Sequence, residues 1–115
     1  MSISTSILRV GSRTIRFGPP MVMGVVNATT DSFSGDGLGE DMRRAVKTGL
    51  DMFAAGAGFV DVGGESTRPG ADTVPTDEEI RRTTEIVRKL AGRHPGRVSI
   101  DTMKAEVARE ALKAG

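Results

Sequence analysis

The chain is most constrained by a regular alternation between short apolar runs and segments with helical spacing. Runs rich in β-branched residues begin at positions 21, 59 and 98, and a stretch with apolar residues every three or four positions follows each of them. We expect strands at 21–26, 59–62 and 98–101, and helices at 41–54, 76–93 and 104–114. Strands and helices that alternate in this way form a parallel sheet with right-handed helical connections.

The residues before this alternation predict a hairpin. Residues 7–10 and 13–17 flank the pair Gly11-Ser12, which suits a tight two-residue turn. The same segment is rich in Ser, Thr and Arg and has no acidic residue before Asp31, a composition typical of a transit peptide. We favour the hairpin, because residues suited to ligand binding begin by Asn27 and leave little sequence to remove.

Local patterns add detail to the expected helices. Thr76 and Glu79 have the spacing of a capping box at the start of the second helix, and His94 suits its end. We expect the arginine pairs at 43–44 and 81–82 to lie on outer, solvated faces. The third helix is expected to bury its apolar residues, which are Val107, Ala108, Ala111 and Leu112.

Composition excludes several classes of function. The 115 residues include no Cys and one His, so a disulfide framework and a thiol nucleophile are excluded and a structural zinc site is not expected. With 16 Lys and Arg against 15 Asp and Glu, and with four Phe as the only aromatic residues, we expect no nucleic-acid partner. The longest apolar run is too short to span a membrane, so we expect no membrane partner either.

Three parallel strands fit either a doubly wound sheet or a (β/α)8 TIM barrel. The loops contain neither a Walker A sequence nor a G-x-G-x-x-G fingerprint, so a nucleotide-binding doubly wound fold lacks its signature. A barrel needs about 250 residues. In a barrel, residues 1–115 would be the amino-terminal portion of one truncated domain, with the hairpin and the first three βα units.

Polar residues lie at or near the carboxyl end of each expected strand, namely Asn27, Asp61 and Asp101. Ligands bind at that edge of the sheet in parallel α/β folds. Asp61 lies within its strand, so it is either a carboxylate satisfied by a neighbouring group or a substrate-binding residue, and both readings stay open. Asp101 ends its strand, which favours a place in a binding site.

The two long loops carry further candidates. Residues 63–70 read Gly-Gly-Glu-Ser-Thr-Arg-Pro-Gly, in which the glycines allow close approach of the backbone to a ligand. Arg68 in this loop offers a planar fork that suits phosphate. Phe33 lies in the polar, Gly-rich loop 27–37, which indicates that it packs on a ligand or belongs to a closing lid.

Three segments resemble the motifs of dihydropteroate synthases. Residues 23–37 resemble M-G-x-x-N-x-T-P-D-S-F-S-D-G-G, residues 61–71 match D-(I/V)-G-G-E-S-T-R-P-G-A almost letter for letter, and residues 98–115 resemble (I/V)-S-(I/V)-D-T-x-K-x-x-V-A-x-x-A-L-x-A-G. The second motif is highly specific, and together the three cover nearly all of the chain after the hairpin. The chain is similar to the amino-terminal part of this family of pterin-binding enzymes.

The resemblance implies a (β/α)8 barrel and a transferase of folate biosynthesis. Such an enzyme condenses p-aminobenzoate with 6-hydroxymethyl-7,8-dihydropterin diphosphate and releases pyrophosphate. The resemblance further implies Mg²⁺ as cofactor, a cytoplasmic location and a homodimer at full length. By position, it assigns Asn27 to Mg²⁺, Thr67 and Arg68 to the diphosphate and the aminobenzoate, Asp101 to the pterin ring, and Asp31 and Phe33 to a first loop that closes over the reacting centre. We therefore expect Asp31, Phe33 and Arg68 to be catalytic, and we place Asp61 with the substrate-binding residues.

The sequence also departs from the family pattern. Thr30 stands where the family has Pro, and residues 35–37 read Gly-Asp-Gly in place of D-G-G. The family's later motifs would lie beyond residue 115, so we expect the 115-residue chain alone to be inactive. Two alternatives stay open, a pterin-binding methyltransferase and a non-catalytic pterin-binding paralogue. The T-R-P segment and the D-S-F-S loop favour the synthase over the methyltransferase.

Overall fold

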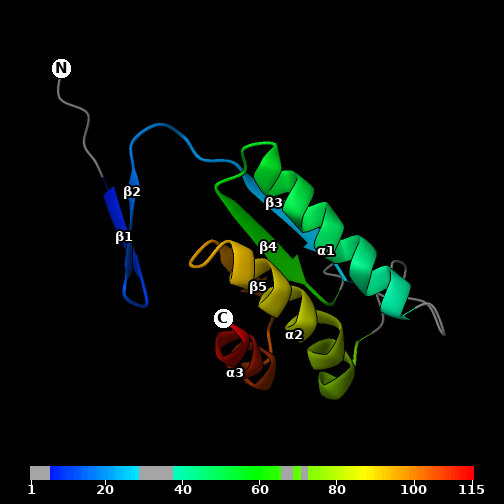
Figure 1. Ribbon diagram of the computed structural model, residues 1–115. Helices are drawn as coiled ribbons and strands as arrows, with labels where there is room; N and C mark the ends of the chain where they lie inside the picture. Colours follow the sequence, from blue (N-terminus) through cyan, green and yellow to red (C-terminus); the bar gives the residue numbers. More distant parts are fainter. Residues whose placement is uncertain (1–5, 29–37, 66–68, 71–72) are drawn as a thin grey trace.

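The computed structural model describes residues 6–28, 38–65, 69–70 and 73–115. This part of the chain contains a two-stranded antiparallel hairpin, a three-stranded parallel sheet and three α-helices (Figure 1). Four of the expected site residues, Asp31, Phe33, Thr67 and Arg68, lie outside the described residues, so their predicted roles are not tested by it.

The predicted parallel sheet is confirmed. Its strands β3 (Met23–Asn27), β4 (Phe59–Gly63) and β5 (Val98–Asp101) lie side by side in chain order. The helices α1 (Leu38–Ala54), α2 (Thr76–Arg93) and α3 (Ala105–Ala114) follow the three strands in turn. The bounds differ from expectation by a few residues, since β3 begins at Met23 rather than at position 21 and α1 begins at Leu38 rather than at position 41.

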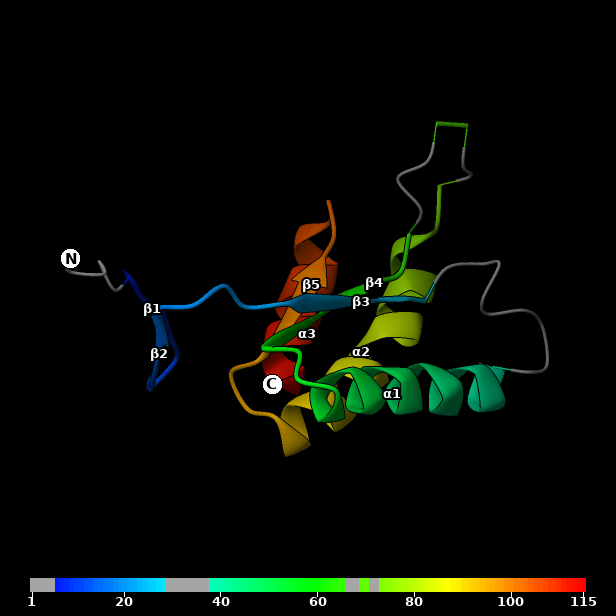
Figure 2. The same ribbon diagram turned by 90° about the horizontal axis from the view of Figure 1, so that it is seen from above.

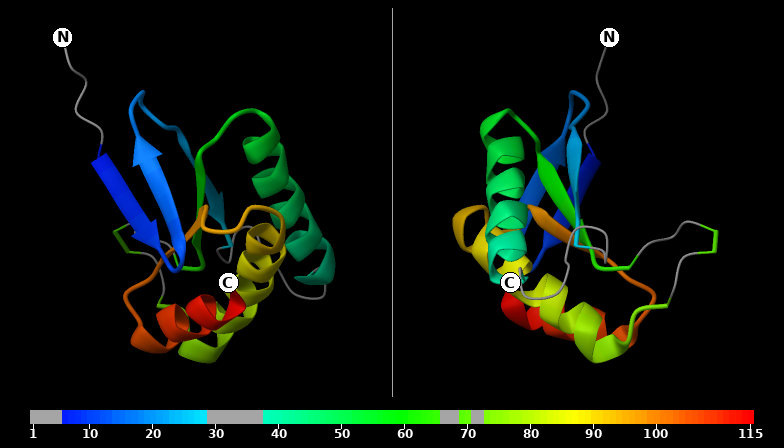
Figure 3. Two further views of the ribbon diagram at one scale, coloured as in Figure 1. Left: turned by 60° about the vertical axis from the view of Figure 1, so that its left-hand side comes forward. Right: turned by 90° about the vertical axis from the view of Figure 1, so that its right-hand side faces the viewer.

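The helices cover one face of the sheet. Helix α1 contacts β3 and β4, and α2 contacts β4 and β5, so both lie on the same side of the strands (Figure 2). Helix α3 lies alongside α2 (Figure 3). The helices α1 and α2 approach closely because residue 49 is Gly, where a Cβ would come within 2.8 Å of the Leu90 side chain.

The core lies between the sheet and the helices. Alternate strand residues such as Val26, Val60 and Val62 point into it and are almost completely buried. From α2, Ile86 and Leu90 complete it at 0% exposure. The opposite face of the sheet is open in the described part of the chain. Met23 and Val25 are about half exposed there, at 51% and 52%.

The predicted hairpin is also confirmed. Strands β1 (Ser6–Val10) and β2 (Arg13–Phe17) pair in antiparallel register, and Gly11 adopts a φ of 60° in the turn between them. The hairpin lies beyond the amino ends of β3 and β4 (Figures 1 and 2). Its Phe17 ring stacks on Phe59 at a centroid distance of 6.1 Å, and the Arg97 guanidinium lies 5.6 Å from the centre of the Phe59 ring.

The predicted capping box at the start of α2 is wrong. Pro75 is the N-cap residue, and the helix start has no hydrogen bond from a capping side chain. Thr76 is already the first helical residue. The Glu79 carboxylate, which a capping box would direct back to the helix start, accepts hydrogen bonds from Thr102 and Lys104 instead. Long-range partners of Glu79 therefore replace the local cap.

The packing of the other helix residues confirms some expectations and corrects others. His94 is the C-cap of α2, with its backbone N–H donating to Leu90 O at 2.8 Å. In α3, Val107 and Ala111 are buried as expected, but Leu112 is 79% exposed. Residue 112 lies about 100° around the helix from residue 111, so it falls outside the stripe that faces α2. The expected outer position of Arg82 is also wrong, because this residue is only 6% exposed.

Candidate functional site

The strand register brings the predicted polar residues into one row at the carboxyl edge of the sheet. Asn27 is paired with Gly63, and Gly63 is paired with Asp101. Side chains alternate between faces along a strand. Because Val26 and Val62 point toward the helices, Asn27 and Asp101 point to the open face. Both side chains are exposed there, which leaves their oxygens accessible to a ligand.

Asp61 lies one layer below this row on the same face. It is paired with Val25 on one side and with Ser99 on the other. The Ser99 hydroxyl donates to the Asp61 carboxylate at 2.6 Å, and both residues are half-buried. A neighbouring side chain therefore satisfies Asp61, as the first of its two readings expects. Its role in substrate binding stays a prediction.

The start of the β4–α2 loop packs closely on α2. A Cβ at Gly64 would lie 2.7 Å from Thr83 Cγ2 and 3.0 Å from Glu79 Cγ, so only glycine fits at this position without a shift. The Arg82 guanidinium donates to the Gly64 carbonyl oxygen at 3.3 Å and to the Glu78 carboxylate at 3.1 Å. This buried arginine holds the backbone at the end of β4 against the helix.

A group of charged and polar side chains lies beside Gly64 and joins two loops. We call Glu65, Glu79, Thr102 and Lys104 the loop-base cluster. The Lys104 ammonium group donates to Glu79 at 2.8 Å and to Glu65 at 3.1 Å. The Thr102 hydroxyl donates to Glu79 at 2.7 Å. Glu79 is only 1% exposed, so these partners offset the cost of burying its carboxylate.

Hydrogen bonds and charge shift two pKa values in the loop-base cluster. The Val74 backbone N–H, followed by the hydrogen bond from Lys104, holds the pKa of the Glu65 carboxyl below its ordinary value of 4.5. The hydrogen bond to Glu79 raises the pKa of Lys104 above its ordinary 10.5; burial opposes this rise and Glu65 adds to it. Both shifts favour the charged forms, so the ion pairs persist at neutral pH.

Sequence reasoning missed the loop-base cluster. Glu65 and Lys104 stand inside the second and third motifs but were given no role of their own. Glu79 was assigned to a helix cap, although it is spaced four residues before Thr83 and seven before Ile86 on the buried stripe of α2. A carboxylate on the buried side of a helix needs a cationic partner, and this signal could have directed a search for one.

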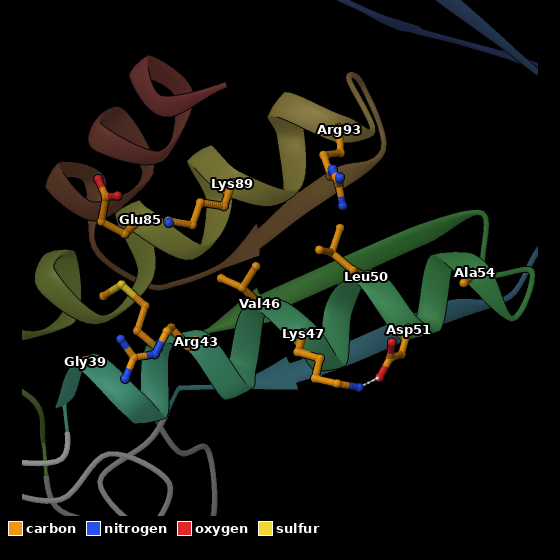
Figure 4. Close-up of a pocket in the computed structure, with 11 residues that line it drawn as sticks. Gly39, Arg43, Val46, Lys47, Leu50, Asp51, Ala54, Glu85, Lys89 and Arg93 are labelled. Carbon is orange, nitrogen blue, oxygen red and sulfur yellow. Dashed lines mark hydrogen bonds and ion pairs between the residues drawn. The ribbon is translucent and has the colours of Figure 1, made fainter.

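A separate groove lies between α1 and α2, with a volume of about 720 Å³ (Figure 4). Val46 and Leu50 form its apolar floor, and Lys47 at its rim pairs with Asp51 at 2.6 Å. The predicted site residues that the structure describes do not line this groove. It lies on the helical side of the sheet, away from the row formed by Asn27, Gly63 and Asp101.

The described residues contain no group of three or more His, Asp and Glu side chains placed to hold a metal ion. Among them, no helix is both long enough and apolar enough to cross a membrane.

Most of the chain resembles known proteins. A model of the family described as "Pterin binding enzyme" matches residues 23–115. The dihydropteroate synthase of Escherichia coli K12 is 48% identical over 96 residues, which cover 84% of this chain and 34% of the relative. That of Mycobacterium leprae is 50% identical over 97 residues, again 84% of this chain and 34% of the relative.

The fold also resembles solved structures of dihydropteroate synthases. The dihydropteroate synthase of Xanthomonas albilineans with 4-aminobenzoic acid gives a TM-score of 0.84 at 43% identity, and the match covers 95% of this chain and 40% of that one. The Burkholderia cenocepacia enzyme complexed with 7,8-dihydropteroate gives 0.78 at 40% identity over 96% of this chain and 35% of that one.

The fold and these comparisons thus show part of a (β/α)8 barrel, and the chain belongs to the pterin binding enzyme family. Within that family, the relatives compared above are dihydropteroate synthases, which confirms the resemblance inferred from the three motifs. The chain spans about a third of the length of the curated relatives it matches. The assignment of residues 1–115 to the amino-terminal portion of a single truncated domain stays a prediction.

Proposed function

We propose that this chain supplies the amino-terminal part of the active site of a dihydropteroate synthase. The observation that carries the proposal is the row of Asn27, Gly63 and Asp101 at the carboxyl edge of the sheet. The chain that forms this sheet is 43% identical to a synthase of known structure. In the reaction, the bond between the pterin methylene carbon and the diphosphate breaks. The p-aminobenzoate nitrogen then bonds to that carbon and loses a proton, while pyrophosphate leaves.

Each residue has a proposed part in this reaction. The Asp101 carboxylate is exposed on the open face and can accept hydrogen bonds from the N–H groups of a pterin ring. We assign Thr67 and Arg68 to the diphosphate and the aminobenzoate, and Asp31 and Phe33 to closing the first loop over the reacting centre. Arg68 would stabilise the negative charge of the departing diphosphate. We place Asp61 beneath the pterin ring, where Ser99 holds its carboxylate.

The donor set at this edge fits Mg²⁺ held mainly by the substrate. Asn27 offers an exposed amide oxygen, and the described residues add no cluster of carboxylates around it. Mg²⁺ commonly keeps several waters and binds through one or two protein oxygens together with substrate phosphates. When bound, Mg²⁺ would neutralise charge that develops on the diphosphate as it leaves. Asn27 would orient that ion at the edge of the sheet.

A hybrid protein tests the proposed function. In it, this chain replaces the matching amino-terminal segment of the Escherichia coli dihydropteroate synthase, and the unmodified E. coli enzyme is the reference. We expect the hybrid to form dihydropteroate from p-aminobenzoate and the pterin diphosphate, with one pyrophosphate released per product. A folded hybrid that binds pterin but releases no pyrophosphate would favour the non-catalytic paralogue. Methyl transfer without condensation would favour the methyltransferase.

The proposed Mg²⁺ role of Asn27 has its own test in the hybrid. Asn27→Ala removes the amide oxygen without disturbing the backbone pairing of β3 with Gly63. We expect the gain in diphosphate-substrate affinity that Mg²⁺ gives the parent to be largely lost in the variant. Calorimetric titrations with and without Mg²⁺ measure this difference. An unchanged Mg²⁺ dependence would remove Asn27 from the metal site.

The chain alone is expected to be inactive and to self-associate. In the described sheet, β3 and β5 each leave one edge unpaired, and Met23 and Val25 are exposed on the open face. Size-exclusion chromatography beside a pyrophosphate-release assay tests this. Turnover by residues 1–115 would show that no further groups are needed. The proposal extends to a cytoplasmic enzyme that is a homodimer at full length, which rests on the family resemblance alone.

A further inference from the structure

We propose that Lys104 is a positioning residue that fixes the β4–α2 loop against the turn that follows Asp101. The inference rests on the proposed function, because it assigns the loop-base cluster a role in placing substrate-binding groups. Lys104 acts through Glu65, which lies in the loop, and through Glu79 on α2.

Glu65 closes the β4–α2 loop through two hydrogen bonds. Its Oε2 atom accepts the Val74 backbone N–H at 2.7 Å and the Lys104 Nζ–H at 3.1 Å. Glu65 and Val74 stand nine positions apart, at the two ends of the segment that carries Thr67 and Arg68. One carboxylate oxygen therefore pins both ends of that segment, and Lys104 holds the same oxygen in place.

The loop-base cluster also holds the turn after β5. Glu79 on α2 accepts from the Thr102 hydroxyl and from the Lys104 ammonium group. The Thr102 oxygen in turn accepts the Lys104 backbone N–H at 3.1 Å, which closes the turn on itself. Lys104 thus joins both loops to the same helix. Asp101 precedes this turn, but its pairing with Gly63 in the sheet fixes it independently.

The ion pairs of Lys104 differ in kind from those on the helix surfaces. Lys113 and Glu110 on α3, for example, are three positions apart and largely exposed. Lys104 reaches partners 39 and 25 positions away, and its side chain is 19% exposed between carboxylates at 12% and 1%. A buried ion pair adds little stability over well-packed apolar side chains. Its directional hydrogen bonds instead fix the relative positions of the elements that it joins.

The hybrid with Lys104→Met tests this role. The methionine keeps the length of the side chain but makes no ion pair. We expect the KM values for p-aminobenzoate and for the pterin diphosphate to rise about tenfold, because the groups proposed to meet them sit on the loop that is released. The affinity for a pterin without diphosphate should change less than about twofold, since Asp101 keeps its strand pairing.

Two comparisons separate positioning from a general loss of stability. Lys113→Met removes a lysine of α3, the helix that Lys104 precedes, from an exposed pair and should change none of these values. Lys104→Arg keeps the charge and both acceptors within reach, so it should restore most of the lost affinity. Hydrogen exchange of the Val74 amide should speed up about tenfold in Lys104→Met and stay unchanged in Lys113→Met.

Different results would overturn the positioning role of Lys104 and the proposed function. Equal losses of pterin and aminobenzoate affinity, or an unchanged Val74 exchange rate, would overturn the positioning role. If Lys104→Met does not fold, Glu65→Gln breaks the ion pair between Glu65 and Lys104 while keeping an acceptor for the Val74 N–H. This variant must then raise the KM values for both substrates while leaving the affinity for a pterin without diphosphate nearly unchanged. A parent hybrid that folds without turnover would contradict the proposed function. In that case, the Val74 exchange rates and the pterin affinity still decide the inference.

Discussion

The two edges of the β3–β4–β5 sheet are held by different kinds of interaction. At the amino edge, the Phe17 ring stacks on Phe59, and Arg97 lies over the same ring. At the carboxyl edge, Lys104 bridges the carboxylate of Glu65 in the β4–α2 loop and that of Glu79 on α2. Aromatic rings bury a large apolar area, so these contacts serve to cover an edge. Charged hydrogen bonds depend on direction, so they set where a loop lies.

This difference in interactions matches a difference in the proposed roles of the two edges. The residues proposed to contact substrate lie toward the carboxyl edge of the described sheet, with Asn27 and Asp101 at the edge and Asp61 one layer below. A binding loop has to be placed to within a fraction of an ångström, whereas the hairpin need only cover apolar surface. We therefore expect changes at the carboxyl edge to alter substrate binding, and changes at the amino edge to alter stability alone.

The largest effect is expected at Gly64, where the β4–α2 loop begins. Gly64→Ala places a methyl group 2.7 Å from the Thr83 side chain and 3.0 Å from that of Glu79. Overpacking of this kind costs about 2 kcal/mol of unfolding free energy. Urea unfolding of the hybrid measures it. The matched control is Gly92→Ala in α2, the helix that carries Thr83 and Glu79. A Cβ at Gly92 would meet no other part of the described chain within 4 Å, so the unfolding free energy should rise by up to about 1 kcal/mol.

If Gly64→Ala proved as harmless as Gly92→Ala, the close packing of the loop start on α2 would not hold. The variant should also raise the KM for p-aminobenzoate, because Glu79 belongs to the loop-base cluster and would be displaced. A loss of stability with unchanged KM would separate the packing of this edge from its function.

The next effect is expected at Asp101. Asp101→Asn keeps the shape of the side chain but places a donor where a pterin N–H would need an acceptor. An unpaired buried polar group costs roughly 1–3 kcal/mol, so pterin affinity should fall about tenfold or more. Calorimetric titration of the hybrid with pterin measures this. Equal affinity in the parent and the variant would remove Asp101 from the pterin site.

Asp61→Asn tests whether substrate contacts extend one layer below Asn27 and Asp101 on the open face of the sheet. An asparagine oxygen can still accept the Ser99 hydroxyl that Asp61 binds at 2.6 Å. If Asp61 contacts substrate as predicted, pterin affinity falls in this variant as well. An unchanged affinity with unchanged stability would leave Asp61 as a carboxylate satisfied by Ser99 alone.

A smaller effect is expected at the amino edge. Phe59→Leu removes the stacking with Phe17 and the contact with the Arg97 guanidinium. These contacts are worth about 1 kcal/mol together, so the unfolding free energy should fall by about that amount. KM values should stay at those of the parent. A rise in either KM would show that the amino edge also positions the site.

The smallest effect concerns pH and the loop-base cluster. The pKa of Glu65 is lowered in the folded chain, so its stabilising contribution is present above pH 4.5 and is lost as the pH falls through the folded value. The pKa of Lys104 is raised, so its contribution is complete below pH 10.5 and is lost as the pH rises through the folded value. The stability difference between the parent hybrid and Lys104→Met should therefore be flat between these limits and shrink outside them. A difference that changes steeply near pH 7 would contradict both shifts.

Features that depend on neighbours in sequence could be predicted well. Periodic apolar residues located each strand and helix to within a few positions, and Gly11-Ser12 located the hairpin turn. The row of Asn27 and Asp101 also followed from sequence, because parallel strands present their carboxyl ends at one edge. The roles of Asp31, Phe33, Thr67 and Arg68 rest on motif resemblance, since these residues lie outside the described part of the chain.

Features that depend on distant partners could not be predicted. Thr76 and Glu79 have a valid capping spacing, but Lys104 lies 25 positions beyond Glu79 and outcompetes the cap. Arg82 follows the exposed Arg81 in sequence, yet it is buried. Its guanidinium donates hydrogen bonds to the Gly64 carbonyl oxygen and the Glu78 carboxylate. Local spacing carries no information on which charged groups meet across the fold.

The crystal structure of the hybrid with the pterin diphosphate and Mg²⁺ would test the functional difference between the edges most directly. We expect the pterin ring to bind on the open face with its N–H groups on the Asp101 carboxylate, the diphosphate to lie beside the loop between Glu65 and Val74, and Asn27 to face the metal. A ring bound at the amino edge near Phe59, or in the groove between α1 and α2, with Asp101 left facing solvent, would contradict this assignment.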